Sequence, residues 1–207
     1  MNGTRLVRGA LVCLCTVILL ASVAYAGEPT EQVRQTVDKV LGILRDKALK
    51  GPARTEERRA LIRKAVDERF DFEEMARRSL ALHWKKRMPE EQREFVSLYS
   101  DLLERAYIKK IEDYTDEKVL YTGEQQEGNR AAVRTTIVTK KNIEIPIEYR
   151  LHRTPRGWEV YDVIIEGVSL VNNYRKQFNS IINSRSYEEL VKRLKSKKPE
   201  EQFEEPK

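Results

Sequence analysis

One stretch of the sequence, residues 157–178, constrains the fold more than any other. Its first half, from Trp158 to Ile165, is β-branched and aromatic, interrupted only by Glu159 and Asp162, which is typical of a strand covered on one face and largely covered on the other. Beyond Gly167 the apolar side chains recur at helical spacing, at Leu170, Val171, Tyr174, Phe178, Ile181 and Ile182. The stretch therefore predicts a buried strand that leads into an amphipathic helix, with one apolar surface shared between them.

Three segments with a two-residue period precede this stretch. Residues 143–151 alternate apolar and polar side chains most regularly, residues 131–137 do so less strictly, and residues 119–122 predict a short strand followed by a polar loop, 123–129. Pro146 cannot donate to a ladder, so its strand lies at an edge or carries a bulge. Short turns join these segments, which predicts an antiparallel meander of about four strands.

Apolar stripes at helical spacing occur before the strands, in residues 33–44, 61–66, 75–80 and 95–111, and after them in residues 187–194. Because the helices do not alternate with the strands, the predicted class is α+β, with helices packed around a curled antiparallel sheet. The stripe in residues 95–111 is wider than a coiled-coil seam, which suits a helix that covers a sheet or lines a cavity.

The two ends of the chain differ from the middle in composition. Arg5 and Arg8 precede an apolar run, residues 10–23, and Ala24-Tyr25-Ala26 provides a small-x-small cleavage site. This pattern predicts a cleaved signal peptide over residues 1–26; the alternative, a membrane anchor, would need an apolar run of roughly 20 residues. We expect one domain over residues 27–196 and, because of its charges and prolines, a disordered tail over residues 197–207.

The sequence offers little catalytic chemistry. Both cysteines lie inside the predicted signal, and the mature chain has only two histidines, His83 and His152, without neighbours at metal-ligand spacing. Asp162 and Glu166 are the most suggestive carboxylates, but four residues of strand would separate them by about 13 Å, which exceeds the separation used by glycosidases. We expect them instead to pair with arginines or to cap a backbone. The sequence thus predicts no catalytic residue, no cofactor and no metal site.

The net charge is +6 for the whole chain and +4 without Arg5 and Arg8. Basic and acidic residues are interleaved, so no nucleic-acid-binding stripe is predicted. A moderate positive excess would favour an anionic membrane surface or an acidic partner, but a simple charged surface is the preferred explanation. On composition alone, the apolar faces of the predicted helices and strands are explained by an ordinary hydrophobic core.

Four stretches resemble motifs of the MlaC family, the periplasmic phospholipid-binding proteins also called toluene-tolerance auxiliary proteins. Residues 157–178 carry the most specific resemblance, and the others are Phe70–Arg77, His83-Trp84 with Pro89–Phe95, and Ile145–Leu151. Together they span about residues 30–195. The chain departs from the family pattern at Ala81, where many members have glycine, and at Met88, where a threonine usually precedes the proline.

The resemblance implies an NTF2-like α+β fold that encloses an apolar cavity for lipid tails. It also implies a soluble, monomeric periplasmic carrier of phospholipid, or of a hopanoid, with no enzymatic activity. Such a carrier exchanges lipid with an inner-membrane ABC transporter complex, which has a substrate-binding ring, and with an outer-membrane lipoprotein complex. It would thereby maintain outer-membrane lipid asymmetry.

We predict that the cavity is lined from the strands and from the helices. Two arginines, Arg150 and Arg175, either flank its mouth and contact a head group or a partner, or form surface ion pairs. The predicted lining residues are Leu98, Leu102, Tyr107, Ile137, Ile145, Ile147, Tyr149, Tyr161, Val163, Ile165, Leu170, Tyr174 and Phe178. Two other functions stay open: an adaptor with a filled core, and a small isomerase-like enzyme with a tyrosine or acid in its pocket.

Overall fold

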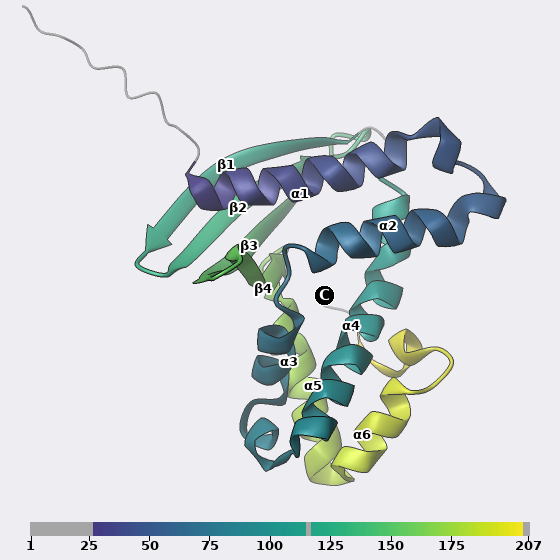
Figure 1. The fold of residues 1–207 in the computed structure, drawn as a ribbon, viewed down its shortest axis with the longest axis vertical. Coiled ribbons are helices and arrows are strands. Elements are labelled where there is room, and N and C mark those ends of the chain that lie inside the picture. The colour runs from purple at the N-terminus through teal and green to yellow at the C-terminus, as the bar shows by residue number, and fades with distance from the viewer. Residues whose placement is uncertain (1–26, 115–116, 205–207) are drawn as a thin grey trace, which may run out of the picture.

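A computed structural model describes residues 27–114 and 117–204. Its sheet has five antiparallel strands in the order of the chain. They are β1 (Lys118–Glu127), β2 (Arg130–Val138), β3 (Glu144–Thr154), β4 (Gly157–Ile165) and β5 (Val168–Ser169). The sheet is curled and unclosed, and the helices lie along its concave side and beyond one end (Figure 1). The predicted α+β class and antiparallel meander are confirmed.

The first hairpin is longer than the sequence predicts. The segment 123–129, expected to be a loop, continues β1 as far as Glu127, and only a tight turn at Gly128 and Asn129 remains. The pairing register shifts between Tyr121 and Gly123, so a bulge carries the strand past the polar residues. The side chains there are polar on both faces of the strand, so the sequence shows no apolar alternation. The end of β1 is a strand that is exposed to water on both faces.

A second bulge, in β4, decides which side chains face the concave side. Arg150 of β3 pairs with Asp162, whereas the next residue, Leu151, pairs with Val160, which leaves Tyr161 as the extra residue. Trp158 and Val160 on one side of the bulge, and Val163 on the other, belong to the same apolar cluster under the sheet. Strict alternation would place Tyr161 with Val163, but the bulge turns it to the convex face.

The end of β4 is a two-residue hairpin rather than a direct passage into a helix. Glu166 and Gly167 both have positive φ, 50° and 86°, which is the conformation of a type I′ turn. The chain then pairs back as β5, and Ser169 caps the next helix by accepting a hydrogen bond from the Asn172 backbone N–H (3.0 Å). The predicted helix therefore begins only after a fifth, very short strand.

The described residues form six α-helices beside the sheet and beyond its end (Figure 1): α1 (Glu28–Arg45), α2 (Thr55–Asp67), α3 (Phe72–Leu80), α4 (Pro89–Glu112), α5 (Leu170–Ser184) and α6 (Tyr187–Leu194). Short 3-10 helices lie at Lys47–Leu49, Pro52–Arg54, Ala81–Lys86 and Pro199–Gln202. Helices α1 and α2 form a hairpin beside the sheet, whereas α3, α4, α5 and α6 gather beyond its end. Asp71 and Ser186 cap α3 and α6, because each side chain accepts a hydrogen bond from the backbone N–H three residues on.

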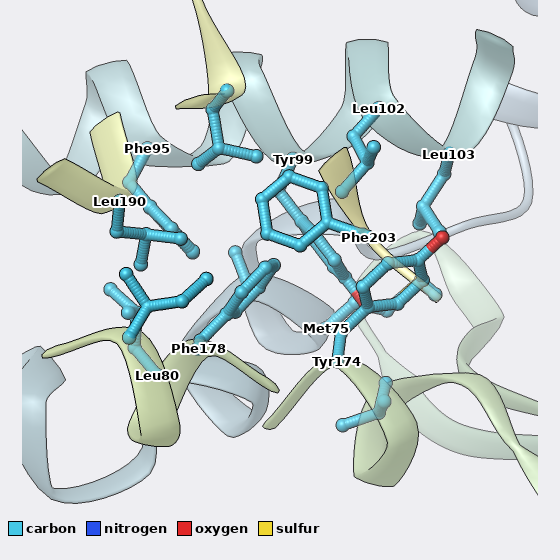
Figure 2. Packing of buried hydrophobic residues seen from close by; sticks show 14 of the residues in the cluster. Met75, Leu80, Phe95, Tyr99, Leu102, Leu103, Tyr174, Phe178, Leu190 and Phe203 are labelled. Carbon is cyan, nitrogen blue, oxygen red and sulfur yellow. The ribbon is translucent and has the colours of Figure 1, made fainter. Parts of the chain in front are cut away.

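The second group of helices has its own apolar core, which Figure 2 shows from close by. Phe95 and Tyr99 of α4 meet Tyr174 and Phe178 of α5, with the Tyr99 and Tyr174 rings edge to face at 5.6 Å. The wide apolar face of α4 thus divides: its N-terminal part fills this helical core, and its C-terminal part turns toward the sheet.

The end of the chain belongs to the same core. The sequence predicts disorder from residue 197, but Phe203 is buried and its ring lies 5.4 Å from that of Phe178, edge to face. Gln177 of α5 fixes the backbone of Glu204 from both sides, since its amide donates to the carbonyl (2.8 Å) and its carbonyl accepts from the N–H (2.7 Å). Burial of the Phe203 ring stabilises this ordered end of the chain, although the residues around it are polar.

The predicted signal peptide, residues 1–26, lies outside the described residues. So do residues 205–207, the last three of the predicted disordered tail. None of the helices that the structure describes is both long and apolar enough to cross a membrane.

Candidate functional site

A cavity of about 450 Å³ lies between the concave face of the sheet, the α1–α2 hairpin and the C-terminal half of α4. Its volume falls within the range of small-molecule sites, about 300–1,000 Å³. The helices contribute mainly aliphatic side chains: Val33, Val37, Val40, Leu41 and Leu44 from α1, Ile62 and Val66 from α2, Met75 from α3, and Leu103, Tyr107, Ile108 and Ile111 from α4.

The floor of the cavity is the apolar face of the sheet. Its residues are Val119, Ile137, Ile145, Ile147, Tyr149, Val160, Val163 and Ile165. The register stacks them across the strands, because Ile137 faces Ile145, and Tyr149 faces Val163. Each row therefore presents branched or aromatic side chains side by side, which makes a continuous apolar surface.

The polar groups on this floor are neutral. Thr135 is buried between the rows, and its hydroxyl donates to the Ile147 carbonyl (3.4 Å). Burial raises the pKa of Tyr149 to about 12, against the smaller opposing effect of its hydrogen bond with Thr135. The phenol is therefore protonated at physiological pH, and the inner surface carries no charge there.

Charged residues also border the cavity. Arg69 is half-buried and donates to the Gln32 side chain and to the Trp158 carbonyl (both 2.6 Å), whereas the other five lie on the solvent side. Asp67, Lys110 and Glu166 are exposed, and Arg63 and Glu104 are half-buried. The cavity thus changes from apolar at the sheet to charged where it meets water.

Hydrogen bonds fix the N-terminal half of α1 over the sheet. Glu124 of β1 accepts from the Thr30 backbone N–H (2.8 Å) and from its hydroxyl (2.6 Å). The Gln32 side-chain carbonyl accepts from the Trp158 backbone N–H (2.9 Å) and from the Arg69 guanidinium (2.6 Å). Farther along α1, Val37, Val40, Leu41 and Leu44 face the cavity and are only half-buried.

Ion pairs, which we call the α2–α4 clasp, join α2 to α4 beside the cavity. Glu112 accepts two hydrogen bonds from Arg58 (3.0 and 2.6 Å) and two from Arg59 (3.1 and 2.8 Å). These bonds, with that of Arg59 the stronger influence, lower the pKa of Glu112. One turn away, Arg63 donates to Asp101 (2.6 Å) and to Glu104. The clasp keeps α2 against α4 through long charged side chains.

The carboxylate Asp162 is structural. Its two oxygens accept from the Ser169 hydroxyl (2.7 Å) and the Val171 backbone N–H (3.1 Å) at the start of α5. It therefore caps a backbone, as expected, while Glu166 borders the cavity on the other side of the sheet. Within residues 27–114 and 117–204, no three His, Cys, Asp or Glu side chains are placed to hold a metal ion.

A sequence model of the MlaC protein family matches residues 34–196. The chain belongs to the MlaC family. The intermembrane phospholipid transport system binding protein MlaC of Haemophilus influenzae is 20% identical over 190 residues, which cover 89% of each chain. A phospholipid-binding protein from Ralstonia solanacearum, solved in complex with a phospholipid, matches with a TM-score of 0.76 and 25% identity, over 85% of this chain and 98% of that one.

In this member of the MlaC family, eight of the thirteen predicted lining residues lie in the cavity wall. They are Tyr107, Ile137, Ile145, Ile147, Tyr149, Val163, Ile165 and Leu170. The other five lie elsewhere. Leu102, Tyr174 and Phe178 are in the helical core, against which Leu98 packs, because α4 and α5 give most of their apolar faces to each other. Tyr161 lies on the convex side because of the β4 bulge.

The two predicted arginines are not among the residues that line this cavity. Arg150 and Arg175 line a second depression on the convex side of the sheet, beside α3 and the start of α5. Arg150 pairs with Glu148 (3.1 Å), and Arg175 donates to the Asn172 side chain (2.5 Å).

Sequence reasoning missed the α1 and α2 contributions to the wall. The predicted lining set contains no residue of either helix, since a stripe at helical spacing does not show whether its partner is a sheet, a helix or a void. The stripe of α1 continues for three turns, from Val33 to Leu44, but its length is no signal of a void, because a sheet of four strands can cover about 16 Å of helix.

Proposed function

We propose that this chain is a periplasmic lipid carrier that holds phospholipid acyl chains in the cavity. In this proposal residues 1–26 direct export and are removed, and the carrier moves lipid between an inner-membrane ABC transporter complex and an outer-membrane lipoprotein complex. That exchange would maintain outer-membrane lipid asymmetry. Membership of the MlaC family and the likeness to a protein solved with a phospholipid support the proposal.

The observation that carries it is an apolar stripe that the protein itself leaves partly uncovered. Val37, Val40, Leu41 and Leu44 of α1 face the cavity floor without being buried. A filled core would bury such side chains, at about 25 cal/mol for each Å² of apolar surface removed from water. An adaptor with a filled core does not account for this gap, whereas a carrier needs it.

The energetics of the role require no catalytic group. A methylene left in water costs about 0.8 kcal/mol, so an acyl chain with on the order of fifteen methylenes faces a barrier of roughly 12 kcal/mol to free transit. A neutral, apolar wall removes most of that barrier. The charged residues on the solvent side leave room for a polar head group in water.

We propose that lipid contacts the residues of the cavity wall rather than the helical core. From the predicted set these are the eight wall residues named above, with the α1 residues Val37, Val40, Leu41 and Leu44 added. Leu102, Tyr174 and Phe178 support the fold instead.

The test is native mass spectrometry, with organic extraction, of the mature chain purified without detergent. A stoichiometric phospholipid would support the carrier, and a hopanoid would support the carrier with a different cargo. A protein that is empty, and that also fails to take phospholipid from vesicles, would refute lipid carriage and favour the adaptor.

A further inference from the structure

The second depression, on the convex side of the sheet, is strongly basic. We call it the basic cleft and define it by its six cationic side chains, Arg77, Arg78, Lys85, Arg130, Arg150 and Arg175. They come from α3, the 3-10 helix after it, β2, β3 and α5, so residues distant in sequence converge on one hollow of about 660 Å³.

The acidic groups nearby do not balance these charges. The carboxylate that lines the cleft, Asp162, is already engaged by Ser169 and Val171. Glu74 is shared by Arg77 and Arg78, and Glu148 pairs with Arg150. Among the described residues, neither Lys85 nor Arg130 has an acidic partner. With these three carboxylates counted, three positive charges remain. Two further carboxylates lie in or beside the row that contains Arg130 and His152, but Asp71 is bonded to His152 and Glu159 to Arg156.

The strand register keeps two of the cations close together. Arg130 pairs with His152 and Arg150 pairs with Ala132, so the two arginines are diagonal neighbours on one face of the sheet, at about 7–8 Å between backbones. Two guanidinium groups at diagonal positions are like charges and repel each other. An external anion would relieve that repulsion.

The chemistry of the cleft favours carboxylates on a flexible chain. Five of its six cations are arginines, whose planar groups bind carboxylates through two parallel hydrogen bonds. Tyr161 also lines the cleft, with the Arg78 guanidinium 4.2 Å from its ring centroid, so this cation–π contact and the ion pair with Glu74 hold Arg78 in place. The cations converge on a hollow from several elements, which a flexible acidic chain can enter more readily than a flat membrane surface can.

We propose that the basic cleft is a docking site for an acidic peptide segment of a partner protein. The cleft does not overlap the lipid cavity, but the two share a wall. Met75, Val160 and Leu170 face the cavity, whereas Arg77, Tyr161 and Val171 face the cleft. The same three elements, α3, β4 and the start of α5, thus separate the proposed cargo from the proposed partner.

The test is fluorescence anisotropy with a labelled peptide of six consecutive glutamates, at low and at physiological salt. We compare the mature chain with Arg130→Glu/Arg175→Glu and with Lys176→Glu/Arg45→Glu as the matched control. Lys176 and Arg45 are exposed and lie outside the cleft. Each double variant replaces two cations with two carboxylates, so both change the net charge by the same amount. Circular dichroism and lipid content are measured on each protein.

We expect the glutamate peptide to bind, and its affinity to fall at least about tenfold in the cleft variant and less than about twofold in the control. Equal losses in the two variants would show general electrostatic attraction and overturn the proposal. Binding to anionic phosphatidylglycerol vesicles that depends on the cleft, without peptide binding, would also overturn it in favour of a membrane surface. Lipid content that stays normal in the cleft variant separates this test from that of the carrier function.

Discussion

Removing the charge of Glu112 tests the α2–α4 clasp. The substitution Glu112→Gln keeps the shape of the side chain but removes the charge that accepts four hydrogen bonds from Arg58 and Arg59. The Glu112 side chain is 12% exposed and that of Arg58 17%, so the pair lies between a surface pair, worth about 0.2–1 kcal/mol, and a fully buried pair, whose loss costs about 3–5 kcal/mol. We expect unfolding free energy to fall by about 2 kcal/mol.

The loss should depend on pH in a defined direction. The hydrogen bonds of Arg59 and Arg58 lower the pKa of Glu112 in the folded state, below its unfolded value of about 4.3. The contribution of Glu112 is therefore complete above about pH 4.3 and is lost as the pH falls through the folded pKa. The difference between wild type and Glu112→Gln should then disappear below that pH.

The assay is urea denaturation of lipid-free protein from pH 7 to pH 3, because bound lipid would add its own stabilisation. Glu57→Gln is the control, since Glu57 pairs with Arg54 on the surface, with both side chains more than half exposed, and should cost less than about 0.5 kcal/mol. An effect of Glu112→Gln no larger than that of the control, or one that persists unchanged to pH 3, would refute the clasp.

Three further predictions concern the cavity, the chain end and the β4 bulge. Val163→Trp should fill the cavity and weaken phospholipid retention about tenfold, measured by extraction after vesicle loading, whereas Ile164→Trp on the opposite face should not; equal losses would contradict the assigned wall. Phe203→Ala should lower the unfolding free energy by about 2–4 kcal/mol, measured in urea titrations. A change below about 0.5 kcal/mol would show that Phe203 is not part of the core and would support the predicted disordered tail. Asp162→Ala should cost about 1–3 kcal/mol, because the buried Val171 N–H loses its acceptor; unchanged stability would exclude its capping role.

The parts of the fold that follow from a simple period were predictable from the sequence. The alternation from Ile145 to Leu151 placed one face of β3 correctly, since a strand with one covered face has only one register that hides its apolar side chains. The same logic failed at Tyr161, because a single bulged residue reverses the alternation and leaves no separate mark in the composition.

The cavity itself was harder to predict than the sheet. The apolar face of α4 reads as one surface in the sequence, yet Tyr99 packs in the helical core while Tyr107 lines the cavity. The division depends on where α5 crosses α4, which is set by tertiary contacts. Phe203 shows the same limit, since one aromatic side chain among charges is ordered only because a pocket between α4 and α5 receives it.

The shared wall has a thermodynamic consequence. Residues next to one another in the chain, such as Val160 and Tyr161, touch opposite chambers, so the wall cannot shift toward one chamber without receding from the other. If occupying the cleft displaces the wall and changes the affinity for lipid by some factor, linkage requires lipid to change the affinity for the peptide by the same factor. A loaded and an empty carrier would then differ in how long each stays at a docking site, with no signal other than the cargo.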